Sequence, residues 1–268
     1  MHRILEMRSA ERDAAFLLPY LEPGQTLLDC GCGPGQITVG LARAVGQGGR
    51  VTGIDLDATV LEQARRSAAD AGVTNLEYRE AGVLALPFPD ESFDAVYFHA
   101  LLCHLPAPEE ALAEARRVLK PSGLVAVSEP DMSAFQIATD DPACLRMLDY
   151  LAAGSRAAGG DPDLGRRLRP LLHGAGFSPT VGSMSVHAHG DPESAPHKAR
   201  AWASLASGST LAANAIAQGL FSAAELDGTA AALRSYAERP DAMLAETWGE
   251  ALGWKDGPAG IWDRRRSS

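Results

Sequence analysis

The sequence lacks the features of several classes of protein. No apolar run approaches the ~20 residues that a membrane-spanning helix needs, and residues 1–13 carry Arg and Glu where a secretory signal has an apolar stretch. The cysteines show neither CxxC spacing nor histidines at the spacing of zinc ligands. We therefore expect a cytoplasmic protein with reduced thiols, no bound metal and no membrane partner. The cysteines are Cys30, Cys32, Cys103 and Cys144.

Positive charge is scarce as well. The formal net charge is -10, and lysine occurs only at positions 120, 198 and 255. A protein that grips a phosphate backbone normally carries a basic face, so we expect no nucleic-acid partner. With 46% hydrophobic and 22% charged residues, the composition is that of an ordinary globular protein. The 268 residues suffice for one α/β domain with an elaborated cap, or for two small domains.

Apolar runs alternate with amphipathic runs through the first two-thirds of the chain. This rhythm is typical of a parallel sheet covered by helices. Five strand–helix units within about a hundred residues predict a doubly wound fold. The expected strands are 26–30, 50–55, 76–79, 93–98 and 123–128, and the expected helices between them are 36–45, 57–71 and 108–119.

The last third predicts helices at 141–158 and 164–174, a sixth strand at 177–187, helix through 191–239 and a final strand at 243–255. The predicted fold class is α/β, a doubly wound Rossmann-like seven-stranded sheet with a helical cap. We place the core at 1–190, a cap or lid insertion at 191–240, and the last strand with a disordered tail at 241–268. Residues 131–165 could also contribute to the cap. The Ala-rich segment 191–239 has few large apolar residues, so we expect it to pack on the carboxyl edge of the sheet instead of forming its own core.

Two features predict a nucleoside site. Gly31, Gly33 and Gly35 follow a strand and precede a helix, where glycines let the backbone pass close to a ligand. Asp55 ends the next strand about twenty residues later, where a carboxylate can accept hydrogen bonds from both hydroxyls of a ribose. Each feature is weak alone, and together they favour a bound nucleoside over a plain turn.

The glycine spacing distinguishes between two nucleosides. A dinucleotide fingerprint, GxGxxG, would need its third glycine at position 36, which is Gln36. Asp29 lies two residues before the first glycine and is tolerable in a site without pyrophosphate, where it can help to hold a cationic amino group. The loop therefore favours S-adenosylmethionine (SAM) over a nicotinamide cofactor.

Several motifs together resemble those of class I SAM-dependent methyltransferases. Residues 27–35 resemble their first motif and residues 53–57 their second. The segment 86–94, LPFPDESFD, with HLP at 104–106 and ARRVLKPSG at 115–123, is similar to the branch that includes the ubiquinone and menaquinone methyltransferases. The resemblance runs from about residue 15 to about residue 187.

The resemblance implies which residues contact SAM. Gly82 and Val83 would face the adenine, and His99 would lie near the methionine moiety. This branch usually has Asp where Gly82 stands, so one contact to the adenine amino group is missing or is made by another group such as Glu80. The implied cofactor-binding residues are Asp29, Gly31, Gly33, Gly35, Asp55, Leu56, Gly82, Val83 and His99.

Methyl transfer mainly requires alignment of the acceptor, and a general base helps when the acceptor is a hydroxyl or an amine. The candidates are His99 and His104 after the fourth strand and Glu129 after the fifth, together with Asp131. His104 could instead be structural in the HLP turn, and Glu129 could equally tie down a loop.

Two histidines and four aromatic residues of the last third are further candidates. His187 and His189 would share a strand face, but they border a Gly-Asp-Pro turn, so we expect them to be exposed. The aromatic residues of the last third could line a substrate pocket or belong to the core. They are Trp202, Phe221, Trp248 and Trp254.

The sequence therefore predicts a SAM-dependent methyltransferase acting on a small-molecule acceptor through an O, N or C nucleophile. Two alternatives stay open: an NAD(P)-dependent oxidoreductase, and a SAM-binding protein of this fold that transfers no methyl group. The sequence leaves a homodimer open.

Overall fold

A single sheet runs through the molecule. The computed structural model describes residues 8–257, and its strands lie in the order β3-β2-β1-β4-β5-β8-β6, with β7 paired to β8. Strands β1 to β5 are parallel, and β8 is antiparallel to β5, β6 and β7. The strands are β1 (Thr26–Cys30), β2 (Arg50–Asp55), β3 (Leu76–Glu80), β4 (Phe93–His99), β5 (Leu119–Pro130), β6 (Gln136–Ile137), β7 (Thr180–His189) and β8 (Leu244–Trp254).

The predicted fold class is confirmed, with one strand more than expected. The extra strand is β6, which has two residues and pairs with the first residues of β8. It forms because β8 is eleven residues long and extends past the end of its pairing with β5.

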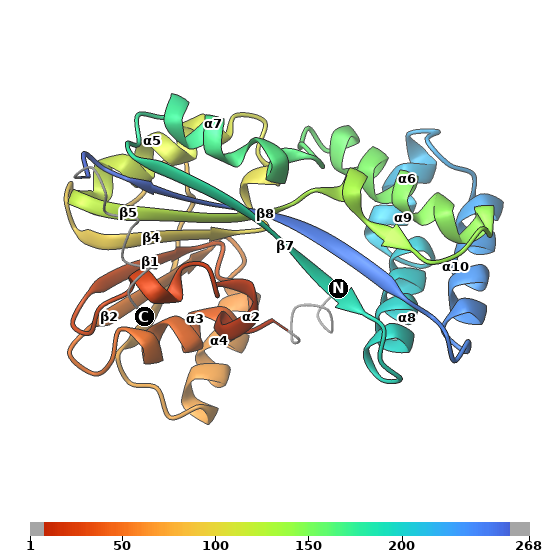
Figure 1. The fold of residues 1–268 in the computed structure, drawn as a ribbon, viewed down its shortest axis with the longest axis horizontal. Coiled ribbons are helices and arrows are strands. Elements are labelled where there is room, and N and C mark those ends of the chain that lie inside the picture. Colours follow the sequence, from red (N-terminus) through yellow and green to blue (C-terminus); the bar gives the residue numbers. More distant parts are fainter. Residues whose placement is uncertain (1–7, 258–268) are drawn as a thin grey trace.

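Helices cover both faces of the parallel part of the sheet (Figure 1). Successive strand residues face opposite sides, so Leu27 packs with the α2 and α3 side and Leu28 with the α5 and α7 side. The helices are α2 (Ala10–Asp13), α3 (Gln36–Ala44), α4 (Ala58–Asp70), α5 (Pro108–Val118), α6 (Pro142–Ala157), α7 (Leu168–Gly174), α8 (Ser194–Ala206), α9 (Thr210–Ala217) and α10 (Ala223–Tyr236), with 3-10 turns η1 (Leu18–Tyr20), η2 (Leu102–His104), η3 (Met132–Ala134) and η4 (Leu164–Arg167).

Helix starts follow the capping residues in the sequence. The Asp57 side chain accepts hydrogen bonds from the backbone N–H groups of Thr59 and Val60, as expected for the N-cap of α4. Pro108 occupies the first turn of α5, where its missing N–H costs nothing. These local signals fix the residues at which α4 and α5 begin.

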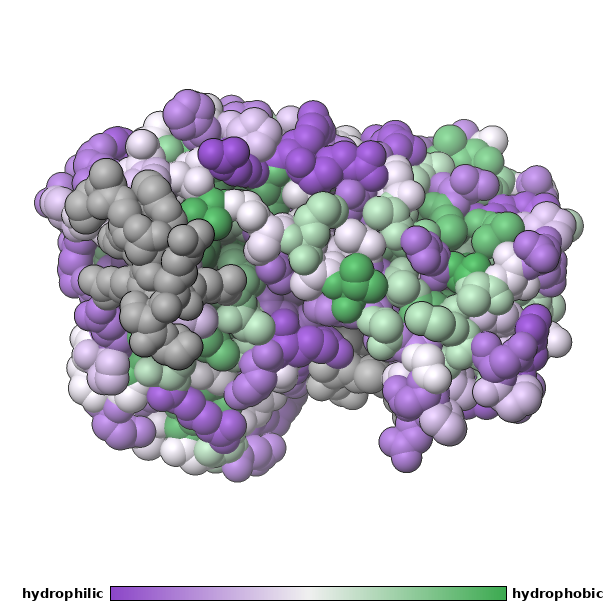
Figure 2. Space-filling view, viewed as in Figure 1, coloured by the Kyte–Doolittle hydropathy of each residue, from purple (hydrophilic) through white to green (hydrophobic). Residues whose placement is uncertain are grey.

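The molecule has two lobes with an indentation between them in the view of Figure 2. The core lobe holds the parallel strands with α2 to α5 and α7, and the outer lobe holds β6, α6, α8, α9 and α10. The long strands β7 and β8 run from the core lobe into the outer lobe (Figure 1). Among the described residues, each helix is too short or too polar to span a bilayer.

The segment 191–239 differs from its prediction. It forms three helices separated by turns, and its apolar side chains do build a core, which they share with α6 and β6. Trp202 and Tyr150 are fully or almost fully buried there, and Phe135 joins them from the loop before β6. The segment 191–239 therefore has no core of its own, as expected, but it completes one with α6, which supplies large side chains that it lacks. The predicted disordered tail lies outside the described residues beyond Gly257.

Candidate functional site

Three strand ends meet at the carboxyl edge of the sheet. Cys30 at the end of β1 pairs with Ile54 on one side and Phe98 on the other, so the residues that follow these strands lie together. Ligands of open α/β sheets bind at this edge, where the strand order reverses. The predicted glycine loop, Asp55 and His99 all lie there.

The glycine loop needs its glycines. Gly31, Gly33 and Gly35 have φ values of +70°, +53° and +84°, a backbone region that side chains disfavour. A Cβ on Gly35 would collide with the Tyr78 hydroxyl. A Cβ on Gly33 would meet no described atom within 4 Å, so open space borders the backbone there and a ligand can approach it.

Asp55 is held beside the loop. One carboxylate oxygen accepts a hydrogen bond from the Gly33 N–H at 3.1 Å, and the other accepts one from the Asp57 N–H at 3.1 Å. Leu56, the next residue, is 75% exposed, and its side chain lies 3.5 Å from the position of a Cβ on Gly82. The structure therefore brings Asp55, Leu56 and Gly82 to one edge, with Val83 buried beside them.

A small hollow lies under the loop, which we call the glycine-loop hollow. Asp29 is almost fully buried and accepts a hydrogen bond from the Thr38 hydroxyl at 2.7 Å. Burial raises the pKa of Asp29 to about 7. Gln36 Oε1 is buried and has no hydrogen-bond partner among the described residues. The hollow is lined by Arg8, Asp29, Gly31, Cys32, Gly33, Pro34, Gln36, Ile37 and His99.

His99 is buried between the glycine-loop hollow and the Trp248 ring. Its ring stacks on Trp248 with centroids 4.8 Å apart and planes 13° apart. Neither ring nitrogen has a hydrogen-bond partner within residues 8–257, and Asp13 Oδ1 lies 4.0 Å from Nε2. Burial lowers the pKa of His99 well below its usual value, with the positive charge of Arg8 as a smaller cause. His99 is therefore a neutral imidazole that is free to bond with a ligand.

The other predicted base candidates lie in different surroundings. Glu129 is fully buried, and its oxygens accept hydrogen bonds from the N–H groups of Leu101 at 3.0 Å, Leu102 at 2.7 Å and Cys103 at 3.3 Å. It thus ties down the loop after β4. His104 is exposed at the end of η2.

The remaining candidate, Asp131, forms an ion pair with Arg166. Of the four candidate bases, the structure leaves only His99 buried with free ring nitrogens beside the glycine loop.

A cavity of about 190 Å³ lies between the lobes, which we call the inner cavity. Ala100 and Trp248 border it from the core lobe, and Phe135 and Trp202 from the outer lobe. Its full lining is Arg8, Arg12, Asp13, Ala100, Cys103, His104, Pro130, Met132, Phe135, Leu151, His187, His189, His197, Lys198, Ala201, Trp202, Leu205, Glu246 and Trp248.

The two strand histidines were expected to be exposed, and this prediction was wrong. They do share one face of β7, but β7 pairs with β8 along its whole length and α8 covers its end. His189 is buried, and the side chain of His187 is 11% exposed. His187 Nδ1 lies 3.9 Å from Asp13 Oδ1, and burial lowers the pKa of His187. Both histidines line the inner cavity.

The four aromatic residues divide between the two roles considered for them. Trp202 and Trp248 line the inner cavity, and the Trp248 indole N–H is buried without a partner among the described residues. Phe221 packs edge-on against Tyr150 in the outer lobe, and Trp254 belongs to the core under α2 and α3.

A buried ion pair at the cavity was not predicted from the sequence. Lys198 of α8 lies 2.5 Å from Glu246 Oε2 of β8, and both side chains are about nine-tenths buried. The same oxygen lies 3.4 Å from His189 Nε2. The signal in the sequence was a lysine among the apolar positions of α8, where Ala195, Ala199 and Trp202 are buried.

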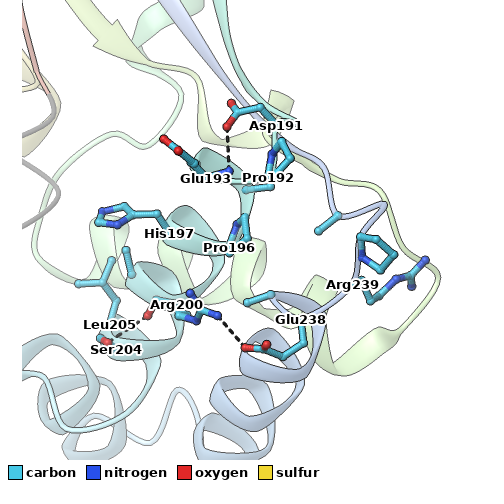
Figure 3. A pocket seen from close by; sticks show the side chains of 15 residues that line it. Asp191, Pro192, Glu193, Pro196, His197, Arg200, Ser204, Leu205, Glu238 and Arg239 are labelled. Carbon is cyan, nitrogen blue, oxygen red and sulfur yellow. Dashed lines mark hydrogen bonds and ion pairs between the residues drawn. The ribbon is translucent and has the colours of Figure 1, made fainter.

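A larger pocket of about 960 Å³ opens on the outer side of α8, which we call the outer pocket (Figure 3). Its arginines are paired, Arg200 with Glu238 at 2.7 Å and Arg239 with Asp241 at 2.8 Å. The outer pocket and the inner cavity share His197, Ala201 and Leu205. Within residues 8–257, no group of three His, Cys, Asp or Glu side chains is arranged to hold a metal ion.

Several proteins of similar sequence are named as methyltransferases. Residues 28–127 match the family described as a methyltransferase domain. The protein of Aspergillus luteorubrus named "Probable methyltransferase ltbC" is 34% identical over 272 residues, which cover 93% of this chain and 92% of that protein. The 2-phytyl-1,4-naphtoquinone methyltransferase of Trichormus variabilis is 41% identical over 107 residues, or 40% of this chain and 47% of the relative.

Solved structures share the fold at lower identity. A SAM-dependent methyltransferase from Methanosarcina mazei has a TM-score of 0.54 and 17% identity, with 91% of this chain and 98% of that chain covered. The [4+2]-cyclase SpnF has a TM-score of 0.52 and 22% identity, with 93% and 79% covered. With a curated relative matched along almost the whole length, the chain belongs to the SAM-dependent methyltransferase family, and its cofactor is S-adenosylmethionine.

Proposed function

We propose that the enzyme binds SAM along the glycine-loop edge and methylates a small molecule in the inner cavity. The observation that carries this proposal is that the two spaces adjoin: Arg8 lines both of them, and His99 of the hollow stacks on Trp248 of the cavity. Curated relatives named for quinone-type acceptors support a small-molecule acceptor. The expected cytoplasmic location and homodimer stay predictions.

The residues at the edge fit SAM. Asp55, held beside the glycine loop by the Gly33 N–H, would accept hydrogen bonds from the ribose hydroxyls, and the open space beside Gly33 would let the backbone meet the ligand. Leu56 and Val83 would contact the adenine from its two sides. In the hollow, the Arg8 guanidinium would take the carboxylate, and the unpaired Gln36 Oε1 would accept a hydrogen bond from the ammonium group.

SAM supplies a methyl group already activated on a positively charged sulfur. The chain has to align the acceptor and exclude water, and alignment alone can supply ~7–11 kcal/mol. The buried His99, whose ring nitrogens have no partner among the described residues and whose pKa is lowered by burial, would take the proton of an acceptor hydroxyl while the oxygen forms a bond to the methyl carbon. SAM would supply the methyl carbon, and its sulfur would keep the electron pair of the broken carbon–sulfur bond.

Glu129 has a different role in this scheme. Because its carboxylate accepts hydrogen bonds from three backbone N–H groups of the loop after β4, it acts as a positioning residue that fixes the loop next to His99.

The residues of α8 that line both the outer pocket and the inner cavity suggest a route by which the acceptor enters. We propose that it enters from the outer pocket past His197, whose ring points away from the middle of that pocket in Figure 3.

Calorimetry and a labelled-methyl assay test the function. We expect the protein to bind SAM and S-adenosylhomocysteine (SAH), but not NAD(P), and to label one or more members of a panel of phenols, quinols and amines. His99→Ala should lower kcat by ~10²–10⁴-fold, the typical contribution of a general base, with SAM affinity within about tenfold. His173→Ala, at an exposed histidine in the last turn of α7 outside both linings, is the matched control and should keep kcat. An unchanged kcat in His99→Ala would contradict the assigned base.

A further inference from the structure

The polar groups of the inner cavity lie at its two ends. Trp248 and Glu246 are two residues apart on β8 and both line the cavity, and this spacing along a strand corresponds to about 6.8 Å. The unpaired Trp248 indole N–H marks the end nearest the glycine loop, where His99, which lines the glycine-loop hollow, stacks on the Trp248 ring. Lys198, Glu246 and His189 mark the far end.

The walls between these ends are flat and aromatic. Phe135 and Trp202 lie nearly parallel, with planes 7° apart and centroids 6.2 Å apart, and both line the cavity. His187 stacks on Trp248, with centroids 5.6 Å apart, and both of these residues line the cavity as well. The cavity volume of about 190 Å³ suits one substituted ring, since an apolar cavity of ~150 Å³ is known to hold benzene.

The far end can both donate and accept a hydrogen bond. Lys198 and His189 both interact with Glu246 Oε2, and Oε1 has no partner among the described residues. The Lys198 ammonium has three N–H donors, of which the ion pair uses one. A hydroxyl can accept from Lys198 and donate to Glu246 at once. A carboxylate would be repelled by Glu246, and an ether could only accept.

We propose that the Lys198–Glu246 pair determines acceptor specificity by binding a second hydroxyl, and that the acceptor is an aromatic ring with two hydroxyls on well-separated carbons. One hydroxyl lies beside His99 and Trp248 and receives the methyl group, and the other lies between Lys198 and Glu246. This inference rests on the proposed function, since it assigns the acceptor end of the same site.

Ligand-observed NMR titrations of the SAH-saturated protein test the pair without knowledge of the natural acceptor. The probes are phenol, resorcinol, hydroquinone and 4-hydroxybenzoate, with a reductant present. We expect resorcinol or hydroquinone to bind about tenfold more tightly than phenol, the gain of one to two net hydrogen bonds. The 4-hydroxybenzoate anion should bind no better than phenol.

The variant that removes the site is Lys198→Met with Glu246→Leu. Changing both residues leaves no buried charge without its partner, so the outer lobe should stay folded. We expect the tenfold preference to fall to about one while SAH affinity stays within twofold. Lys120→Met, which removes a lysine paired with Asp94 at 2.8 Å and absent from the cavity lining, should keep the preference.

Two results would overturn the inference while leaving the proposed function in place. The first is a diphenol preference that survives in the double variant. The second is equal or absent binding of all four ring compounds to a wild-type protein that does bind SAH. A wild-type protein that binds neither SAM nor SAH would instead contradict the proposed function.

Discussion

The two lobes differ in whether local sequence signals or packing between distant segments determines their structure. In the core lobe, most parallel strands are followed closely in the sequence by a helix that packs on the sheet. Local signals such as the glycine loop and the Asp57 cap mark where the strands end and the helices begin. In the outer lobe, α8 and α10 carry many alanines, pack on each other and share one core with α6, which precedes α8 by almost forty residues. The cofactor edge therefore belongs to one lobe alone, whereas the inner cavity needs both.

The largest expected effect comes from substituting one buried tryptophan in each lobe, which tests whether the two lobes contribute differently to cofactor binding and turnover. Trp202→Ala removes a 2% exposed side chain from the outer lobe, and Trp254→Ala removes a 3% exposed one from the core lobe. Each should cost ~3–5 kcal/mol of stability in its own lobe. We expect Trp202→Ala to abolish turnover but keep SAH affinity within about tenfold, and Trp254→Ala to lower both.

Thermal unfolding monitored together with SAH calorimetry checks this difference. Loss of SAH binding in Trp202→Ala equal to that in Trp254→Ala would show that the two lobes fold as one unit.

A substitution at the cofactor edge of the core lobe should have a smaller effect, on cofactor affinity alone. Asp55→Ala should weaken SAM and SAH binding by ~1.5–3 kcal/mol, the range for hydrogen bonds to a charged group, because the ribose hydroxyls lose their acceptor. Asp57→Ala is the matched control: it removes the cap of α4, which should lower stability by ~1 kcal/mol without lowering affinity. A calorimetric affinity for SAH that stays within twofold of the wild-type value in Asp55→Ala would show that Asp55 does not bind the ribose.

The smallest expected effect is a pH dependence of cofactor binding that arises from Asp29. Its pKa is about 7 in the free protein because of burial, so it is largely protonated at pH 6. A ligand ammonium in the hollow favours the ionised carboxylate. SAH affinity should therefore rise by up to about tenfold per pH unit as the pH approaches 7, and level off above it.

Buffers of different ionisation enthalpy measure the proton released when SAH binds. In Asp29→Asn both the proton release and the rise in affinity should disappear. An equal pH dependence in the wild type and in Asp29→Asn would show that another group titrates.

The sequence predicted the core lobe well because its signals are local. The strand 26–30 and the strand 50–55 have the predicted bounds, and Asp55 lies beside the glycine loop as its spacing implied. Such features depend on residues a few positions apart, where turn chemistry and alternation determine the backbone.

The inner cavity could not be predicted in the same way. It combines Asp13 from α2, Trp248 from β8 and Lys198 from α8, which come together only through the pairing of β7 with β8 and the packing of the outer lobe. His187 and His189 were correctly placed on one face of a strand, but the sequence did not show that α8 would cover that face. The residues missed at the site are therefore those that depend on contacts between the lobes.

The central claim is that the donor lies in the core lobe with its reactive group facing the cavity between the lobes. A crystal structure of the SAH complex tests it most directly. We predict that the ribose hydroxyls bond to Asp55 and that the SAH sulfur lies beside His99 and faces the inner cavity. A sulfur that faces away from His99 and Trp248, with the ribose distant from Asp55, would contradict the account.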